Sequence, residues 1–224
     1  MININQKWNF YKTADAEPEL VDLPHTWNGK DGQDGTGMWR GKGVYERELF
    51  FSEEALGKSL YLEIEAASLV SNVFINQKQV YRNSCPYAMY RIPINPYIES
   101  GKNIVSIEVD NSINEKVYPH MADFSFYGGL YRNVSVIEAE NMHFDYLDGS
   151  RDGIYVTAEP GTDKRWNLNV KGKVISEKAE CNIIVCCKLL DKENVVCQED
   201  TEIYVEKQSD FSIDMAVLNP HLWN

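Results

Sequence analysis

The residues most able to do chemistry lie in one stretch, Met121–Val134, which reads MADFSFYGGLYRNV. A lone carboxylate, Asp123, stands among aromatic residues there, and the pair Gly128-Gly129 follows it. A carboxylate in an apolar setting needs a partner, such as an arginine, backbone N–H groups, a cation or a ligand hydroxyl. The two glycines permit a tight turn that would present it. From the residues alone, a ligand-binding Asp123 and an Asp123 that only caps this turn are equally well supported.

A glycine-rich run, Asn28–Gly43, is the second stretch that could touch a ligand. It lacks the G-K-[ST] that opens a helix in a phosphate-binding loop, and a strand pattern follows it instead. We therefore interpret it as a long, flexible surface loop of the kind that borders binding sites. Within it, Trp39 suits the apolar face of a sugar and Arg40 suits its hydroxyls. An aromatic packed onto the domain is an equally good interpretation of Trp39, and His25 is interpreted as a packed, hydrogen-bonded residue.

The composition disfavours several classes of function. The net charge is −12, whereas a nucleic-acid interface or an anionic membrane requires a basic face, so we expect neither partner. The five cysteines form no C-x-x-C pair, which is typical of reduced thiols rather than of disulfides or a zinc site. The first residues lack a secretory pattern, and no apolar run approaches the ~20 residues of a membrane span. We expect a cytoplasmic protein.

Apolar and polar residues alternate with a period of two along nearly the whole chain. Short strands separated by turn signals, with no helical stripe, predict an all-β sandwich architecture. The acidic connection Glu138–Met142 is a candidate boundary, and we place the domains at residues 1–139 and 140–224. The second strand series has the length and rhythm of an immunoglobulin-like sandwich, although it lacks the Cys…Trp…Cys spacing of antibody domains. We interpret its final residues, NPHLWN, as the end of a truncated domain.

Five motifs occur in a suitable order and spacing along the chain, namely LPHTWN, RGKGVYERELF, NVFINQKQV, GKNIVSIEVDNS and MADFSFYGGLYRNV. Together they resemble the N-terminal sugar-binding domain of glycoside hydrolase family 2. This is the family of β-galactosidases, β-glucuronidases and β-mannosidases. The second strand series is similar to the family's immunoglobulin-like domain, in which a P-x-L-W motif leads into the last strand before the catalytic barrel. One departure is Gln77, which stands where the family usually has glycine in an Asn-Gly-Lys hairpin and makes a type I′ turn less comfortable.

The resemblance implies a galactose-binding-like jelly-roll domain, an immunoglobulin-like domain and then a (β/α)8 barrel. In such enzymes two glutamates of the barrel, ~5–5.5 Å apart, hydrolyse the glycoside with retention. A barrel takes ~250 residues, so both glutamates are expected outside this chain and no catalytic residue within it. By the same resemblance, Asp123 contacts the sugar and, in some members, a nearby sodium ion. Arg40 falls where another sugar-contacting loop residue lies.

We therefore expect a non-catalytic N-terminal fragment of a retaining glycosidase, in the first place a β-galactosidase acting on terminal β-D-galactosides. Asp123 and Arg40 would form one edge of its sugar pocket. The alternatives are a fragment of a β-glucuronidase or β-mannosidase, or a free-standing carbohydrate-binding module. The fragment itself should require no cofactor, and sodium near Asp123 belongs to the full-length enzyme. Expected partners are carbohydrate, the enzyme's own C-terminal barrel and, as in family members that assemble, further copies of the chain.

Overall fold

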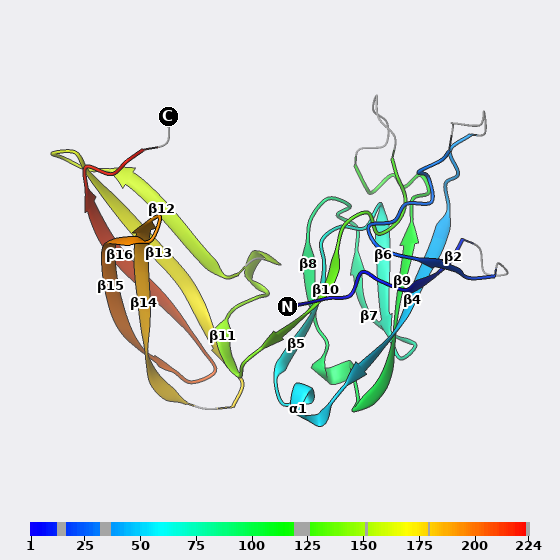
Figure 1. Cartoon of the computed structure of the whole chain (residues 1–224), viewed down its shortest axis with the longest axis horizontal. Helices are drawn as coiled ribbons and strands as arrows, with labels where there is room; N and C mark the ends of the chain where they lie inside the picture. The colour runs from blue at the N-terminus through cyan, green and yellow to red at the C-terminus, as the bar shows by residue number, and fades with distance from the viewer. Residues whose placement is uncertain (13–16, 32–36, 119–125, 151, 179, 223–224) are drawn as a thin grey trace. The chain divides into compact units, whose positions relative to one another are not determined.

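The computed structural model describes residues 1–224 except 13–16, 32–36, 119–125, 151, 179 and 223–224. The chain divides into two compact units, Met1–Glu138 and Ala139–Asn224. Almost all regular structure is β-strand (Figure 1), so the all-β prediction is confirmed. The helices are short: α1 (Glu53–Leu56), η1 (Asn95–Tyr97) and η2 (Asp148–Ser150). No helix in the described part of the chain is long and apolar enough to cross a membrane.

The larger sheet of the first unit has six strands in the order β3-β2-β4-β9-β6-β7. Their bounds are β2 (Trp8–Tyr11), β3 (Glu19–Val21), β4 (Lys42–Phe51), β6 (Val70–Ile75), β7 (Lys78–Asn83) and β9 (Gly101–Asp110). Strand β9 lies between β4 and β6 and is antiparallel to both. Its alternate residues Val105, Ile107 and Val109 are completely buried. The predicted period of two therefore places them in the core.

A smaller sheet of four strands, in the order β1-β10-β5-β8, completes this unit. Its strands are β1 (Ile2–Asn3), β5 (Ser59–Ile64), β8 (Tyr90–Pro93) and β10 (Val134–Ala139). Strand β1 pairs with β10, with Ile2 opposite Val136, so the beginning and the end of the unit lie side by side. Inward side chains of both sheets form one core, in which Trp8, Tyr45 and Leu62 are completely buried. Burial of such large side chains is the main stabilising contribution to the fold.

The hairpin between β6 and β7 contains Gln77, which stands where the family usually has glycine. Asn76 has φ 50° and Gln77 has φ 69°, so both turn residues lie in the left-handed region that a type I′ turn requires. Gln77 occupies a conformation in which glycine pays no steric cost. The turn therefore forms in spite of its sequence.

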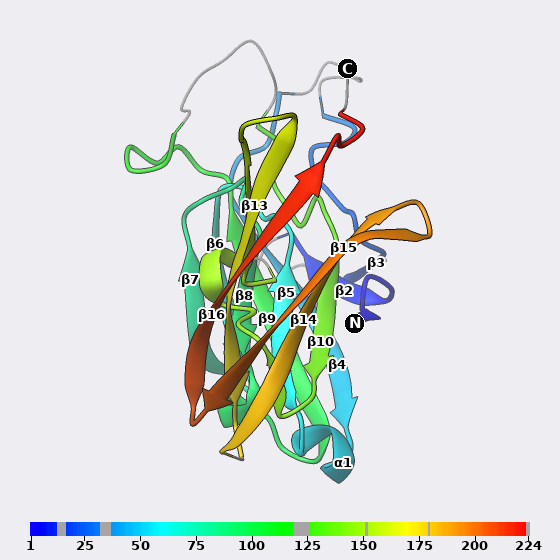
Figure 2. The ribbon, with the colours of Figure 1, turned by 90° about the vertical axis from the view of Figure 1, so that its left-hand side faces the viewer.

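The second unit is a smaller sandwich. Strand β13 (Arg165–Ser176) pairs with β11 (Met142–Phe144), β12 (Ile154–Pro160) and β16 (Gln208–Leu218). Strands β14 (Cys181–Asp191) and β15 (Asn194–Val205) form a separate two-stranded hairpin (Figure 2). Cys181 and Cys187, which the pattern predicts as core residues, are only partly buried, because a two-stranded sheet covers less of the facing sheet than a wide one does.

Candidate functional site

Arg40 lies directly before β4, at one end of the first unit, and is half-buried. Its guanidinium carbon lies 5.3 Å from the centroid of the Phe126 ring, within the range of a cation–π interaction. Asp123, the other predicted site residue, lies outside the described residues. Phe126 is the first described residue after it. The structure therefore brings Arg40 to the end of the segment that contains Asp123, while the role of Asp123 stays a prediction.

The two glycines that follow Phe126 are required by their surroundings. A Cβ on Gly128 would lie 2.1 Å from the ring of Trp27. Gly129 has φ +125°, and its Cβ would lie 2.6 Å from both the His25 carbonyl oxygen and the Tyr45 hydroxyl. No larger side chain fits either position without displacing a neighbour. The backbone therefore passes close to its neighbours at this pair, and the turn that would present Asp123 stays a prediction.

Asn28 is the centre of a buried polar network behind Arg40, with an exposed fraction of only 2%. Its Nδ2 donates to Asp31 Oδ2 at 2.6 Å and to the Trp39 carbonyl at 2.7 Å. Its Oδ1 accepts from the Gly128 N–H at 2.7 Å and from Asn111 Nδ2 at 3.1 Å. Both donors and both lone pairs of the amide are therefore engaged.

Asn111, which follows β9 and is completely buried, extends this network. Its Oδ1 accepts from the Gly41 N–H at 2.8 Å, and its own N–H donates to the Gly41 carbonyl at 3.1 Å. Its Nδ2 also donates to the Phe126 carbonyl at 3.3 Å. The two amides thus hold the residues on both sides of Arg40 and the residue over which its guanidinium lies.

His25 lies at the same end of the unit and is a neutral, packed residue, as the sequence indicated. Its Nδ1 lies 2.7 Å from the Tyr45 hydroxyl, and its N–H donates to the Leu130 carbonyl at 2.8 Å. Burial lowers the pKa of His25 below its ordinary value, and the nearby Glu19 carboxylate opposes part of this effect. Burial likewise raises the pKa of Tyr45 above its ordinary range. This pair is therefore structural at neutral pH.

Trp39 is packed onto the domain, which decides between its two interpretations. It lies against the core and meets the ring of Trp27 edge-on, with ring centroids 5.5 Å apart. The Lys12 ammonium lies 4.9 Å from the centroid of its ring. Within the described residues, the buried Nε1 of Trp27 has no hydrogen-bond partner, which is costly for a buried donor.

The described parts of residues 28–43 before β4 form a surface loop, as predicted, with Gly29, Lys30, Gly37 and Met38 exposed. Hydrogen bonds to Trp39 and Gly41 anchor this loop after residues 32–36. Sequence reasoning missed Asn28, which precedes Gly29, and Asn111, which lies between Asp110 and Ser112, because such polar stretches are typical of exposed turns. Their mutual bond joins positions 83 residues apart, and the bond from Gly128 to Asn28 spans 100. No local pattern could reveal such partners.

A hollow of about 520 Å³ lies beside His25. Its described lining is Phe10, Lys12, Glu17, Glu19, His25, Thr26, Trp27, Gly29 and Lys30. Arg40 does not line it, so the hollow and the pair formed by Arg40 and Phe126 are separate features. Among the described residues, no group of three or more His, Cys, Asp or Glu side chains could hold a metal ion.

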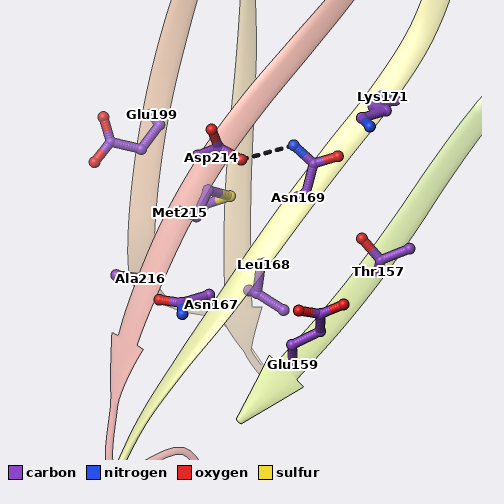
Figure 3. A pocket seen from close by; sticks show the side chains of 10 residues that line it. All are labelled: Thr157, Glu159, Asn167, Leu168, Asn169, Lys171, Glu199, Asp214, Met215 and Ala216. Atoms are coloured by element: carbon purple, nitrogen blue, oxygen red, sulfur yellow. Dashed lines mark hydrogen bonds between the residues drawn. The ribbon is translucent and has the colours of Figure 1, made fainter. Parts of the chain in front are cut away.

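A second hollow, of about 620 Å³, lies in the second unit on strands β12, β13 and β16. Figure 3 shows amide and carboxylate side chains around it, with Asn169 directed at Asp214. Asn169 Nδ2 donates to Asp214 at 2.6 Å and to Ser212 at 2.9 Å. These cross-strand partners satisfy one another and stabilise a polar sheet face.

Known proteins are similar to the chain over its whole length. A β-glucuronidase of Bacteroides fragilis is 28% identical over 229 residues, which cover 100% of this chain and 33% of that protein. A β-galactosidase of Thermoanaerobacter pseudethanolicus is 23% identical over 80% of this chain and 24% of its own length. The crystal structure of a Bacteroides uniformis β-glucuronidase has the same fold, with a TM-score of 0.89 at 24% identity, over 99% of this chain and 28% of that one.

The chain thus spans a third or less of the length of these relatives. Residues 2–140 match the family described as "Glycosyl hydrolases family 2, sugar binding domain". The resemblance drawn from the five sequence motifs is confirmed, and the chain belongs to glycoside hydrolase family 2.

Proposed function

We propose that this chain is the non-catalytic N-terminal part of a family 2 glycosidase, and that the whole enzyme hydrolyses terminal β-D-glucuronides. The observation that carries the proposal is the 28% identity to a β-glucuronidase over 100% of the chain. The β-galactosidase matches are weaker, at 23% identity over 80% of the chain for one and 25% over 94% for a β-galactosidase of Bacteroides ovatus. The initial expectation of a β-galactosidase is therefore less well supported than its β-glucuronidase alternative.

The chemistry of Arg40 supports a uronide. A guanidinium hydrogen-bonds a carboxylate through two parallel, charge-assisted N–H···O bonds, which are about twice as strong as neutral ones. Its contact with the Phe126 ring at 5.3 Å would hold it in place. A glucuronide carries a carboxylate where a galactoside carries a neutral hydroxymethyl group, so Arg40 would favour the glucuronide. Asp123 would accept hydrogen bonds from sugar hydroxyls on the same edge.

The reaction itself belongs to residues outside this chain. Retaining glycosidases use one carboxyl group as acid/base and one as nucleophile, and we place both in a catalytic barrel that is the principal partner of these two units. This chain would contribute substrate-binding contacts at one edge of the pocket, which lower KM and so raise kcat/KM. The sodium ion expected near Asp123 stays a prediction, because Asp123 lies outside the described residues, and no step of the proposal uses a metal ion.

The test is hydrolysis of p-nitrophenyl β-D-glucuronide and β-D-galactoside by the full-length natural protein. We expect kcat/KM for the glucuronide to be higher by about 100-fold or more, since a site built to pair a charged group strongly rejects an analogue without it. In Arg40→Gln, glucuronide kcat/KM should fall by about 10- to 100-fold, the loss of one charge-assisted pair. A protein that prefers the galactoside would contradict the glucuronidase assignment, and one that cleaves neither would contradict the glycosidase assignment.

A free-standing carbohydrate-binding module is the alternative outside the enzyme class. Calorimetry of the 224-residue chain with glucuronate, galactose and mannose distinguishes it. A chain that supplies one edge of a pocket should bind each sugar only weakly, because most of the contacts are missing. Submillimolar binding, at about −4 kcal/mol or better, would favour the module.

A further inference from the structure

We propose that Asn111, together with Asn28, positions Arg40 against the segment that follows Asp123 and thereby sets the enzyme's affinity for its sugar. Neither amide is a catalytic residue, since each acts through other groups. The kinetic part of this inference rests on the proposed function, whereas the positioning itself does not.

The first step is that the two amides hold the backbone on both sides of Arg40. Asn28 Nδ2 donates to the Trp39 carbonyl at 2.7 Å. Asn111 exchanges two hydrogen bonds with Gly41, at 2.8 and 3.1 Å. The Arg40 Cα cannot shift without breaking one of these bonds, so its side chain starts from a fixed point.

The second step is that the same two amides hold the backbone after Asp123. The Gly128 N–H donates to Asn28 Oδ1 at 2.7 Å, and Asn111 Nδ2 donates to the Phe126 carbonyl at 3.3 Å. Asn111 Nδ2 also donates to Asn28 Oδ1 at 3.1 Å. One amide pair therefore fixes the two segments that carry the predicted sugar contacts relative to each other.

The third step is that water cannot replace these bonds. Asn111 is 0% and Asn28 is 2% exposed. Loss of the Asn111 donor would remove its bonds to the Phe126 carbonyl and to Asn28 Oδ1 in an interior that water does not reach, so the two segments would be held less firmly. A displacement of about 1 Å in a binding constellation can cost up to about 100-fold in rate, so even a small shift should be measurable.

Asn103 provides a matched control at the other end of β9. It is also 0% exposed, and its Oδ1 accepts a backbone bond from Glu99 N–H at 2.9 Å and a side-chain bond from Asn76 Nδ2 at 2.9 Å. Its Nδ2 donates to two oxygens, the carbonyls of Glu99 at 2.7 Å and Gly101 at 3.2 Å. An Asn→Asp change at either position keeps the accepted backbone bond and removes two donated bonds. Only the change at Asn111 touches the predicted sugar contacts.

The first experiment is NMR of the 224-residue chain, which needs no activity. Because the Arg40 guanidinium lies over the Phe126 ring, its NεH and δ-proton resonances should show a ring-current shift. We expect Asn111→Asp to move these resonances towards the values of a free arginine and Asn103→Asp to leave them unchanged. Resonances that stay unchanged in Asn111→Asp, or that move equally in both variants, would overturn the inference.

The second experiment is steady-state kinetics of the full-length enzyme with p-nitrophenyl β-D-glucuronide. We expect Asn111→Asp to raise KM by about 10-fold or more with kcat within about 3-fold, the signature of lost substrate binding. Asn103→Asp should leave KM within about 2-fold of the wild type, even where both variants lower the melting temperature equally. Equal changes in KM would mean that Asn111 is merely structural. A wild-type protein without glycosidase activity would instead contradict the proposed function, and the NMR result would still decide the positioning role.

Folding is checked by circular dichroism. If Asn111→Asp fails to fold, Asn28→Asp takes its place, because it keeps both accepted bonds and loses the donations to Asp31 and Trp39. We expect the same NMR and kinetic changes. If both variants unfold while Asn103→Asp folds, the amide pair serves stability alone and the inference is wrong.

Discussion

The two ends of strand β9 are held by hydrogen bonds to different kinds of partners. At its beginning, Asn103 bonds to the turn directly before it, two to four positions away in the sequence, and to Asn76, 27 positions away. At its other end, Asn111 joins segments up to 83 positions away. The first end therefore forms from contacts of shorter sequence separation, whereas the other end requires several distant segments to be in place at once. The predicted sugar contacts lie at the end built from distant segments, where a change at one residue reaches several loops.

The largest difference between the ends should appear at their glycines. Both Gly129 and Gly101 have positive φ, but a Cβ on Gly129 meets the His25 carbonyl oxygen at 2.6 Å, while one on Gly101 meets nothing within 4 Å. We expect Gly101→Ala to lower the unfolding free energy by about 1 kcal/mol through backbone strain alone. Gly129→Ala should lower it by about 3 kcal/mol or more, because overpacking adds to the strain. Urea denaturation measures both, and equal losses would show that the contacts around Gly129 yield easily.

The unfolding free energy should depend on pH through the protonation of His25. Its folded-state pKa is lowered from the ordinary 6.5 by burial, so below about pH 6.5 the unfolded chain binds a proton more readily than the folded one. The unfolding free energy should therefore fall as the pH drops through this range and be unaffected by His25 above it. In His25→Gln, which stays neutral and can still bond to Tyr45, this contribution should vanish. Urea denaturation between about pH 5.5 and 8 measures the difference between wild type and variant, and a difference that is constant with pH would contradict the prediction.

The smallest effect is expected at the turn near the beginning of β9. Gln77 has φ 69°, so Gln77→Gly should raise the unfolding free energy by about 0.5 kcal/mol, since relief of the steric cost exceeds the added freedom of the unfolded chain. The melting temperature measures this gain. The Arg40 resonances and the KM of the full-length enzyme should not change. A loss of stability would indicate that contacts of the Gln77 side chain stabilise the fold by more than its backbone strain destabilises it.

The sequence predicts the strands well because their information is local. The alternation Val105, Ile107 and Val109 is enough to place β9 in the core, where all three residues are completely buried. The Gly128-Gly129 pair marks a special backbone geometry, but the neighbours that require glycine there, Trp27 and His25, are distant in the sequence. Asn28 and Asn111 could not be found in this way, because nothing in a single amide indicates a partner about a hundred positions away.

In the second unit, the pattern of β14 predicts Cys187 as a core residue, and Cys187 is partly buried and packed against the core of that unit. Alternation identifies the inward face of a strand, but it does not encode how deeply each side chain is buried. Asp123 stays a prediction of the family resemblance, because it lies outside the described residues.

The pairing of β1 with β10 has a consequence for synthesis. Ile2 pairs with Val136, and Asn5 Nδ2 donates to Asn133 Oδ1 at 2.8 Å across 128 positions. On the ribosome, the first residues of the protein must therefore wait for almost the whole unit to be made before they find their partners. The segment at 128–130, which closes the end that carries Arg40, emerges just before them. We expect the proposed sugar-binding edge to be among the last parts of the nascent unit to form, so that a stalled or prematurely released chain would lack it.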